Sequence, residues 1–170
     1  ITGSGKTEVY MEMMEEVLRD GKQVIGRIPE LALPYPTGMR FYRRFGNLVS
    51  VINSRLSKGE RCDQFERALK GEIQVMIGPR SALFTPFENL GLIVIDEEQE
   101  GAYKSELAPR YHAREVAEER AAMAGAGLVL GSATPSLESY TRALRGEYRL
   151  LRLEKRAKKD SRLAQVEIVD

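Results

Sequence analysis

Glycine, lysine and threonine open the chain in an order that suits phosphate binding. Within the run ITGSGKT, Gly5, Lys6 and Thr7 match the end of the phosphate-loop pattern G-x-x-x-x-G-K-[ST]. Gly3 and Gly5 let the backbone bend so that several N–H groups point at phosphate oxygens, and a following helix adds its positive N-terminal end. A flexible Gly/Ser turn that caps a helix is the alternative interpretation, and the acidic motif described next argues against it.

Each residue of this loop has an expected role in holding ATP. The backbone of Gly3, Ser4 and Gly5 cradles the phosphates. Lys6 reaches the β- and γ-phosphates, and the Thr7 hydroxyl ligates Mg²⁺. Because I-T-G-S fill the variable places of the pattern, its first glycine and the strand that should precede the loop are expected upstream of this sequence.

Two acidic residues follow an apolar strand at the end of the run LGLIVIDEEQ, residues 90–99. Such a strand, buried on both faces, delivers Asp96 and Glu97 to the edge of an open α/β sheet where ligands bind. Asp96 is expected to hold Mg²⁺, and Glu97 to orient and deprotonate the attacking water. Acids directly after a strand are also a common exit to a loop, but their combination with the phosphate loop favours nucleotide hydrolysis.

A third motif, GSATPS at residues 131–136, follows another short apolar strand. The hydroxyls of Ser132 and Thr134 can hydrogen-bond to the acidic site and to a neighbouring domain. A simpler interpretation is a helix start, with Thr134 as N-cap and Pro135 as the first helical residue. The two interpretations are compatible.

Composition fixes the class of protein to which these motifs belong. The 170 residues are 42% hydrophobic and 30% charged, which suits one globular domain and excludes a disordered chain. No apolar run approaches the length of a membrane span. A single cysteine, Cys62, and a single histidine, His112, exclude an intrachain disulfide and a multi-histidine metal site, and we expect His112 to start a helix. The net charge of +1 argues neither for nor against nucleic acid.

Hydrophobic periodicity predicts strands that alternate with helices, and therefore an α/β fold with a mostly parallel sheet covered on both faces. One residue fits poorly, because Arg27 lies in a strand expected to be buried. Strands are predicted at 22–28, 48–52, 73–77, 90–95, 128–130 and 148–153. Helices are predicted at 6–20, 35–45, 57–69 with a Ser57/Glu60 capping box, 112–124 with Ala113, Val116, Ala117, Ala121 and Ala124 inward, and 134–144.

In their order and spacing, GSGKT, DEEQ and GSATPS resemble motifs I, II and III of superfamily 2 helicases. PELALP, GPRSALF, DEEQEGAYK, PRYHARE and GSATPSLES are similar, more specifically, to the primosomal replication-restart DNA helicases. The resemblance implies that residues 1–153 are the RecA-like, ATP-binding first lobe of such a motor, truncated at its N-terminus. Residues 154–170 would be a linker and the start of the next segment. A DNA-binding part would lie upstream, and a second lobe with zinc-binding cysteines downstream.

The same resemblance assigns residues to single-stranded DNA. Pro29 and Glu30 match motif Ia, and Arg80 and Ser81 match motif Ib, both of which lie on the DNA path in the family. Residues 100–115 match an aromatic-rich loop that links DNA binding to ATP hydrolysis. That loop offers stacking faces and phosphate-binding charge, from Tyr103, Tyr111, Lys104, Arg110 and Arg114. On residue types alone, a surface loop with two half-buried tyrosines is an equal interpretation.

Four positions depart from the family pattern, and one of them is Pro79, which stands where threonine is common. Gln99 stands where the family has histidine; glutamine keeps a donor and an acceptor but cannot be protonated. We expect Gln99, with Ser132 and Thr134, to couple the ATP and DNA sites. Pro34 and Pro36 replace polar residues of motif Ia and have no N–H to donate.

The family assignment implies an ATP- and Mg²⁺-dependent 3′-to-5′ helicase that assembles the primosome at stalled forks in the bacterial cytoplasm. Its partners would be single-stranded and forked DNA, single-stranded-DNA-binding protein and other primosome proteins, with no membrane. An arginine finger would come from the second lobe, so this segment alone should hydrolyse ATP negligibly. The alternatives are a degenerate, non-catalytic nucleotide- or DNA-binding module and a phosphate-loop kinase for a small molecule.

Overall fold

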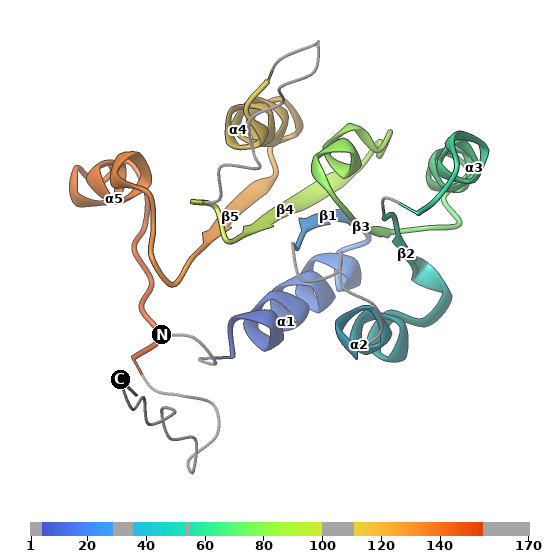
Figure 1. The fold of residues 1–170 in the computed structure, drawn as a ribbon, viewed down its shortest axis with the longest axis horizontal. Helices are drawn as coiled ribbons and strands as arrows, with labels where there is room; N and C mark the ends of the chain where they lie inside the picture. The colour runs from blue at the N-terminus through green and yellow to red at the C-terminus, as the bar shows by residue number, and fades with distance from the viewer. Residues whose placement is uncertain (1–4, 29–35, 54, 100–110, 155–170) are drawn as a thin grey trace, which may run out of the picture.

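A five-stranded parallel sheet forms the centre of the computed structural model, which describes residues 5–28, 36–53, 55–99 and 111–154 (Figure 1). Every described strand pair is parallel, and the strand order is β2-β3-β1-β4-β5. The strands are β1 (Gln23–Arg27), β2 (Val49–Val51), β3 (Val75–Ile77), β4 (Leu90–Asp96) and β5 (Gly127–Gly131). The predicted α/β fold is confirmed.

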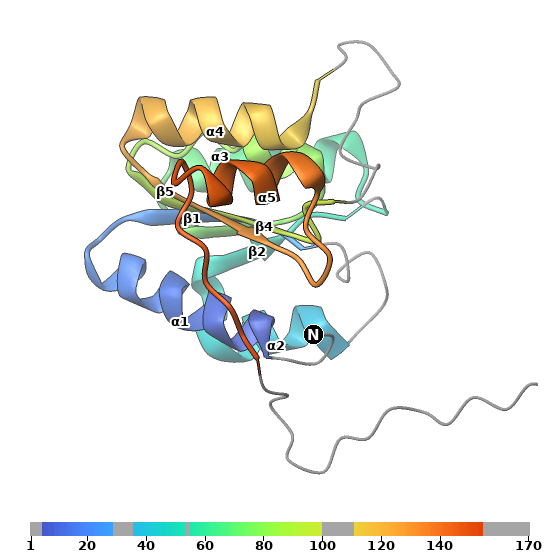
Figure 2. The same cartoon turned by 90° about the vertical axis from the view of Figure 1, so that its left-hand side faces the viewer.

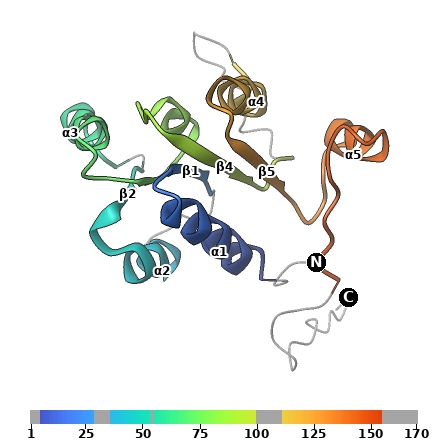
Figure 3. The ribbon, with the colours of Figure 1, turned by 180° about the vertical axis from the view of Figure 1, so that it is seen from behind.

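Helices cover both faces of this sheet, as Figure 2 shows most clearly. One face carries α1 (Lys6–Arg19) and α2 (Pro36–Phe45), and the other carries α3 (Lys58–Leu69) and α4 (Ala113–Ala124). Helix α5 (Leu137–Leu144) lies beyond β5 at the edge of the sheet (Figure 3). Two 3-10 helices, η2 (Gly46–Leu48) and η3 (Arg80–Phe84), connect the layers.

The side chains of the inner strands alternate between two apolar cores. Val24 packs with Met14 and Phe41 against α1 and α2, whereas its neighbour Ile25 faces the opposite core with Ile93. This alternation follows from the two-residue period of a strand. β4 is buried on both faces, as its nearly continuous apolar run predicts.

Several helix ends match the sequence prediction. The Ser57/Glu60 capping box forms at the start of α3. His112 is the N-cap of α4, because its Nδ1 accepts a hydrogen bond of 3.3 Å from the Arg114 backbone N–H. The expectation that His112 starts a helix is therefore confirmed.

Other local predictions are corrected. The N-cap of α5 is Ser136 rather than Thr134, because the Ser136 hydroxyl accepts from the Ser139 N–H and the helix begins only after it. Residues 148–153 form no strand; they run past the edge of β5 without pairing to it. Ala124, predicted to face inward, is exposed at the end of α4.

The close packing of β5 against α1 gives a test of the fold. A Cβ added to Gly131 would lie 1.7 Å from the Tyr10 hydroxyl, whereas one added to Gly127 would have its nearest contact at 3.5 Å. We expect Gly131→Ala to lower the free energy of unfolding by about 1–3 kcal/mol, because the core must shift to admit the methyl group. Gly127→Ala, in the same strand, is the matched control. Equal denaturation midpoints for the two variants would contradict this packing.

Candidate functional site

A lysine and two acids meet at the carboxyl edge of the sheet. Lys6 Nζ lies 2.5 Å from Glu97 Oε1, to which it donates a hydrogen bond, and 3.3 Å from Asp96 Oδ1. Asp96 is almost fully buried, and the side chains of Lys6 and Glu97 are 18% and 24% exposed. Residues 90 positions apart in the chain are thus brought together as the sequence predicts, since α1 begins where β4 ends.

The backbone before Lys6 has the geometry that a phosphate loop needs. Gly5 is the N-cap of α1 with a left-handed φ of 86°, a conformation that favours glycine. The first turn of the helix, with Lys6 and Thr7, therefore begins beside the Lys6–Asp96–Glu97 cluster, and the N–H groups of a helix N-terminus stabilise an anion. Gly3 and Ser4, predicted to complete the loop, lie outside the described residues.

The chain turns sharply at Glu97, and this turn separates three successive acids. Glu97 has a φ of 50°, and in the described ranges it is the one residue other than glycine with positive φ. That conformation costs about 1–2 kcal/mol for a residue with a Cβ. It directs Glu97 toward Lys6 and Glu98 toward α5, where the Glu98 side chain is 1% exposed. The next backbone N–H, that of Glu98, bonds to the Gly131 carbonyl at 3.1 Å.

Two residues that the sequence reasoning missed support Asp96. The buried Tyr10 hydroxyl donates to Asp96 Oδ1 at 2.8 Å, and Arg27 donates from Nη1 to the Asp96 carbonyl at 3.2 Å. Arg27 is 6% exposed, so its charge in a buried strand is stabilised by a polar partner rather than by solvent. Tyr10 falls on the apolar face of α1, where its pattern gives no sign of a polar role.

The predicted coupling residues form a chain of hydrogen bonds from Glu97. Gln99 Nε2 donates to Glu97 Oε2 at 2.8 Å, and the Ser132 hydroxyl donates to Gln99 Oε1 at 2.5 Å. Thr134 joins through its backbone, because its N–H donates to Ser132 Oγ at 2.9 Å. The structure thus brings all three of these residues together beside Glu97.

Neighbouring charges and burial shift the pKa values of Lys6 and Glu97 in opposite directions. Burial alone lowers the pKa of Lys6, but the hydrogen bond to Glu97 and the charges of Asp96 and Glu97 outweigh it, so the pKa is raised. Burial alone raises the pKa of Glu97, but hydrogen bonds from Gln99 and Lys6 and the charge of Lys6 outweigh it, so the pKa is lowered. Both groups are therefore charged near neutral pH.

The oxygen donors of the site suit Mg²⁺. The Asp96 carboxylate and the Thr7 hydroxyl are hard ligands, and Mg²⁺ is commonly held by one or two protein oxygens together with phosphates and water. No group of three or more His, Cys, Asp or Glu side chains within the described ranges could hold a metal by itself. Thr7 and Asp96 would hold the ion, which when bound would neutralise charge on the phosphates.

A second cluster gathers around the predicted DNA contacts. The Arg80 guanidinium carbon lies 5.9 Å from the centre of the Tyr111 ring, and Phe84 meets the same ring edge-to-face at 5.4 Å. Phe84 is 53% exposed and Ser81 is partly buried. Phe84 was not among the predicted site residues. Arg114, predicted to supply phosphate-binding charge, is only 15% exposed and lies against Glu98 instead. The other predicted contacts lie outside the described residues: Pro29, Glu30, Tyr103, Lys104 and Arg110.

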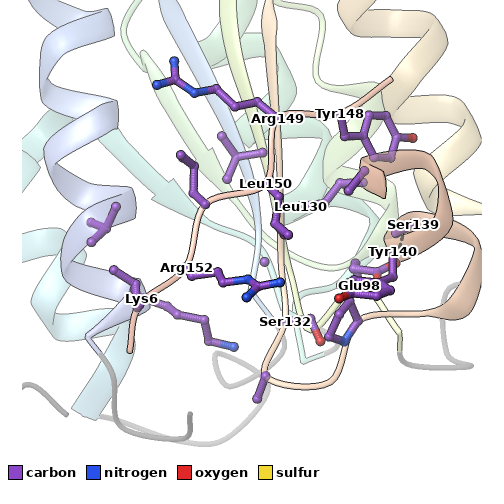
Figure 4. Close-up of a pocket in the computed structure, with 18 of the residues that line it drawn as sticks. Lys6, Glu98, Leu130, Ser132, Ser139, Tyr140, Tyr148, Arg149, Leu150 and Arg152 are labelled. Carbon is purple, nitrogen blue, oxygen red and sulfur yellow. Dashed lines mark hydrogen bonds between the residues drawn. The ribbon is translucent and has the colours of Figure 1, made fainter. Parts of the chain in front are cut away.

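A cavity of about 980 Å³ lies between α1, β5, α5 and residues 148–154. Figure 4 shows Lys6 and Ser132 at one end of it and Tyr148 and Arg149 at the other, with Leu130 and Leu150 between them. β5 pairs only with β4 among the described strands, so its other edge faces this cavity. Apolar side chains such as Leu130 and Leu150 line the middle of the cavity, and Lys6 and Ser132 place polar groups at one end.

The ion pair between Lys6 and Glu97 has a consequence that can be titrated. In the nucleotide-free chain, Glu97 should titrate below the ordinary glutamate pKa of about 4.3. The pair therefore stabilises the fold above that pH, and its contribution is lost as the pH falls through the lowered pKa. In Lys6→Met the raising effect of burial is opposed by the Gln99 hydrogen bond but no longer by Lys6, so the pKa of Glu97 should rise. Carbon-detected NMR of the glutamate carboxyls measures this, with the exposed Lys70→Met as control; an unchanged pKa in Lys6→Met would contradict the pairing.

Curated relatives match nearly the whole chain. The replication restart protein PriA of Bacillus subtilis is 51% identical over 156 residues, which cover 92% of this chain and 19% of the relative. PriA of Chlamydia pneumoniae is 52% identical over 158 residues, covering 92% and 21%, and PriA of Rickettsia conorii is 42% identical over 170 residues, covering 100% and 26%. The chain thus spans about a fifth to a quarter of the length of these relatives, and the resemblance drawn from its motifs is confirmed.

Solved structures of low identity agree on the fold. The C-terminal part of the Fun30 ATPase domain superposes with a TM-score of 0.53 at 12% identity, over 88% of this chain and 47% of that one. The C-terminal domain of Dbp5 from S. cerevisiae gives 0.53 at 13%, over 84% and 82%. None of the helices in the described ranges has the length and apolar character of a membrane span. The model of the family "DEAD/DEAH box helicase" matches residues 1–143, and with this RecA-like fold the chain belongs to that family.

Proposed function

We propose that this chain is the ATP-binding motor lobe of a 3′-to-5′ DNA helicase that acts in replication restart. The observation that carries the proposal is the contact of Lys6 with both Asp96 and Glu97 at the carboxyl edge of the sheet. A triphosphate placed against the first turn of α1 would meet the lysine, and the acids lie next to it. The names of the similar proteins supply the biological context.

The resting ion pair suggests how ATP binding prepares hydrolysis. In the structure the Lys6 ammonium is held by Glu97, which lowers the basicity of that carboxylate. Phosphate oxygens compete for the ammonium, and when they take it Glu97 loses its strongest cationic partner. Burial then acts against the charge of Glu97 with less opposition, so its pKa rises toward a value that suits a general base. Glu97 is thereby free to orient and deprotonate the attacking water.

The hydrogen-bond chain beside Glu97 would report this change to the rest of the molecule. Gln99 contacts Glu97 with one end of its amide and Ser132 with the other. A shift of the Glu97 carboxylate therefore moves Ser132 and the Thr134 N–H, which begin the connection to α5. We propose these three residues as the coupling link between the ATP site and a neighbouring lobe.

We further propose that single-stranded and forked DNA binds across η3 and Tyr111. Arg80 and Tyr111 combine a cation with a stacking face, the pairing that sequence-tolerant binding of single strands uses. Arg80 Nη1 is buried and makes no hydrogen bond within the described part of the chain, so an acceptor on DNA would satisfy it after a small rearrangement. The exposed ring of Phe84 extends the same surface.

The organisation of the whole protein is part of the proposal. Residues 1–153 would be the first lobe and 154–170 the start of the next segment, with the arginine finger supplied by a second lobe. The open edge of β5 and its apolar cavity would accommodate the strand expected before the phosphate loop. Single-stranded-DNA-binding protein and other primosome proteins are the proposed partners, in the bacterial cytoplasm.

The alternative functions fit the site less well. A degenerate, non-catalytic module would not be expected to keep Lys6, Asp96 and Glu97 in mutual contact. A small-molecule kinase has no need of a glutamine that links its acid to a serine after the next strand. The match to the DEAD/DEAH box helicase family favours the motor lobe over a small-molecule kinase.

Substitution of the phosphate-loop lysine and the acid should separate binding from chemistry. In the full-length protein, Lys6→Ala and Glu97→Gln should each abolish DNA-stimulated ATP turnover and unwinding, with losses of about 100-fold or more. Glu97→Gln should retain nucleotide affinity, since the amide keeps the volume of the carboxylate and no longer forms an ion pair with Lys6. Fluorescent-nucleotide binding and forked-duplex unwinding measure the two effects. Loss of nucleotide binding in Glu97→Gln would remove this residue from the role of base.

Substitution of the η3 surface should weaken DNA binding without disturbing the nucleotide. We expect Arg80→Gln and Tyr111→Ala to raise the dissociation constant for single-stranded DNA, with Tyr111→Ala costing about 1–3 kcal/mol through lost stacking. The losses should fall on DNA of any sequence, and the contribution of Arg80 should shrink as salt rises. Fluorescence anisotropy with labelled oligonucleotides measures both, and Arg55→Gln on the exposed turn before α3 is the control. Unchanged affinity in both variants would place the DNA elsewhere.

A further inference from the structure

Glu98, the third acid of the run Asp96-Glu97-Glu98, belongs to a buried polar cluster outside the proposed ATP site. Glu98 Oε1 accepts from the Ser136 backbone N–H at 2.6 Å, and Oε2 accepts from the hydroxyls of Ser136 and Ser139 at 3.1 and 3.0 Å. Arg114 Nη1 lies 3.7 Å from the same Oε2 and donates to both serine hydroxyls, at 3.2 and 3.0 Å. These four residues are the Glu98 cluster, and they join the end of β4 to the first turns of α4 and α5.

The burial of this cluster excludes an ordinary surface role. The Glu98 side chain is 1% exposed and that of Arg114 15%, so both charges depend on each other and on the serines. Loops that merely connect elements do not need a buried carboxylate with three donors. A buried carboxylate held by several hydrogen bonds fixes the position of the backbone that carries it.

That backbone is the turn that aims Glu97. Glu98 follows the left-handed Glu97 directly, and its own N–H is bonded to the Gly131 carbonyl. Because the Glu98 side chain and its backbone N–H are both hydrogen-bonded, the backbone at Glu98 cannot rotate without breaking several hydrogen bonds. The unfavourable φ of Glu97 is therefore maintained from the C-terminal side, by contacts that do not include Lys6 or a nucleotide.

Arg114 connects the cluster to the surface where Tyr111 meets Arg80. It lies in the first turn of α4, three residues after Tyr111 and beside the N-cap His112. Further along α4, Arg120 donates to the carbonyls of Leu83 and Thr85, which fixes the helix to the end of η3. A displacement of Tyr111 thus reaches Arg114 through less than one helical turn.

We propose that Glu98 and Arg114 are positioning residues that hold Glu97 in its catalytic direction and transmit displacements of α4 to it. The proposal rests on the proposed function, since it assigns the means by which DNA at the Tyr111 surface regulates the base. Neither residue touches the nucleotide in this scheme. Loss of the Glu98–Arg114 contact should therefore lower the rate of the chemical step and leave binding largely intact.

The test uses the full-length protein with Glu98→Gln, Arg114→Gln and the milder Ser139→Ala. DNA-stimulated kcat should fall about tenfold or more in the first two and less in the third, because Glu97 is no longer held in place. The dissociation constant for nucleotide and the DNA concentration for half-maximal stimulation should each change less than about threefold. Arg142→Gln is the matched control, because it removes another α4–α5 ion pair, with Glu118 at 2.8 Å, away from Glu97.

The outcomes separate this inference from the proposed function. If the unmodified protein shows no DNA-stimulated ATP turnover, the proposed function fails. If it does and Glu98→Gln and Arg114→Gln keep full kcat, the positioning role alone is wrong. An equal loss of kcat in Arg142→Gln would mean that stability, measured as the thermal midpoint, explains the effect, and this also overturns the inference. If Glu98→Gln and Arg114→Gln prevent folding, the kcat of Ser139→Ala tests the positioning role instead, and an unchanged kcat overturns it.

Discussion

Two adjacent carboxylates at the end of a buried strand repel one another, and the whole edge of this sheet is organised around the cation that relieves them. Lys6 lies within 3.3 Å of Asp96 and 2.5 Å of Glu97, and Arg27 approaches the Asp96 carbonyl from the neighbouring strand. A lysine can serve this purpose only if α1 begins beside the end of β4. The left-handed Gly5, the packing of Met14 beneath the sheet and the parallel strand order all contribute to that placement.

The left-handed turn at Glu97 divides the acidic motif between two tasks. On one side, Glu97 faces the lysine and the amide of Gln99, where charge can change when phosphate arrives. On the other, the Glu98 side chain is 1% exposed and contacts Arg114 and two serines. Glu97, whose contacts can change, is thus followed directly by Glu98, whose contacts are fixed. Such an arrangement allows a small displacement at either side to alter the direction of the Glu97 carboxylate, the proposed base, without unfolding the strand.

Sequence patterns predicted most of this architecture because its signals are local. Each such signal lies within a few neighbouring residues. Examples are the apolar run of β4, the Ser57/Glu60 capping box and the glycine before Lys6. The site contacts that escaped prediction are long-range and come from residues with ordinary apolar or structural explanations. Tyr10 reads as part of a helix face, yet its hydroxyl reaches Asp96 across 86 residues. The pattern marks Thr134 as a cap, but Glu98 draws the Ser136 N–H and shifts the helix start by two residues.

Glutamine at position 99 is compatible with a coupling role for a reason that lies in its amide. The Glu97 carboxylate only accepts hydrogen bonds, so the amide nitrogen must face it and the carbonyl oxygen must face Ser132. A histidine could make the same two contacts only while neutral, and protonation would remove its acceptor. Gln99 keeps donor and acceptor at every pH at which the protein is folded. Gln99 therefore adds no titrating group to the link from Glu97 to Ser132, and within that link only the Glu97 carboxylate can change its protonation state.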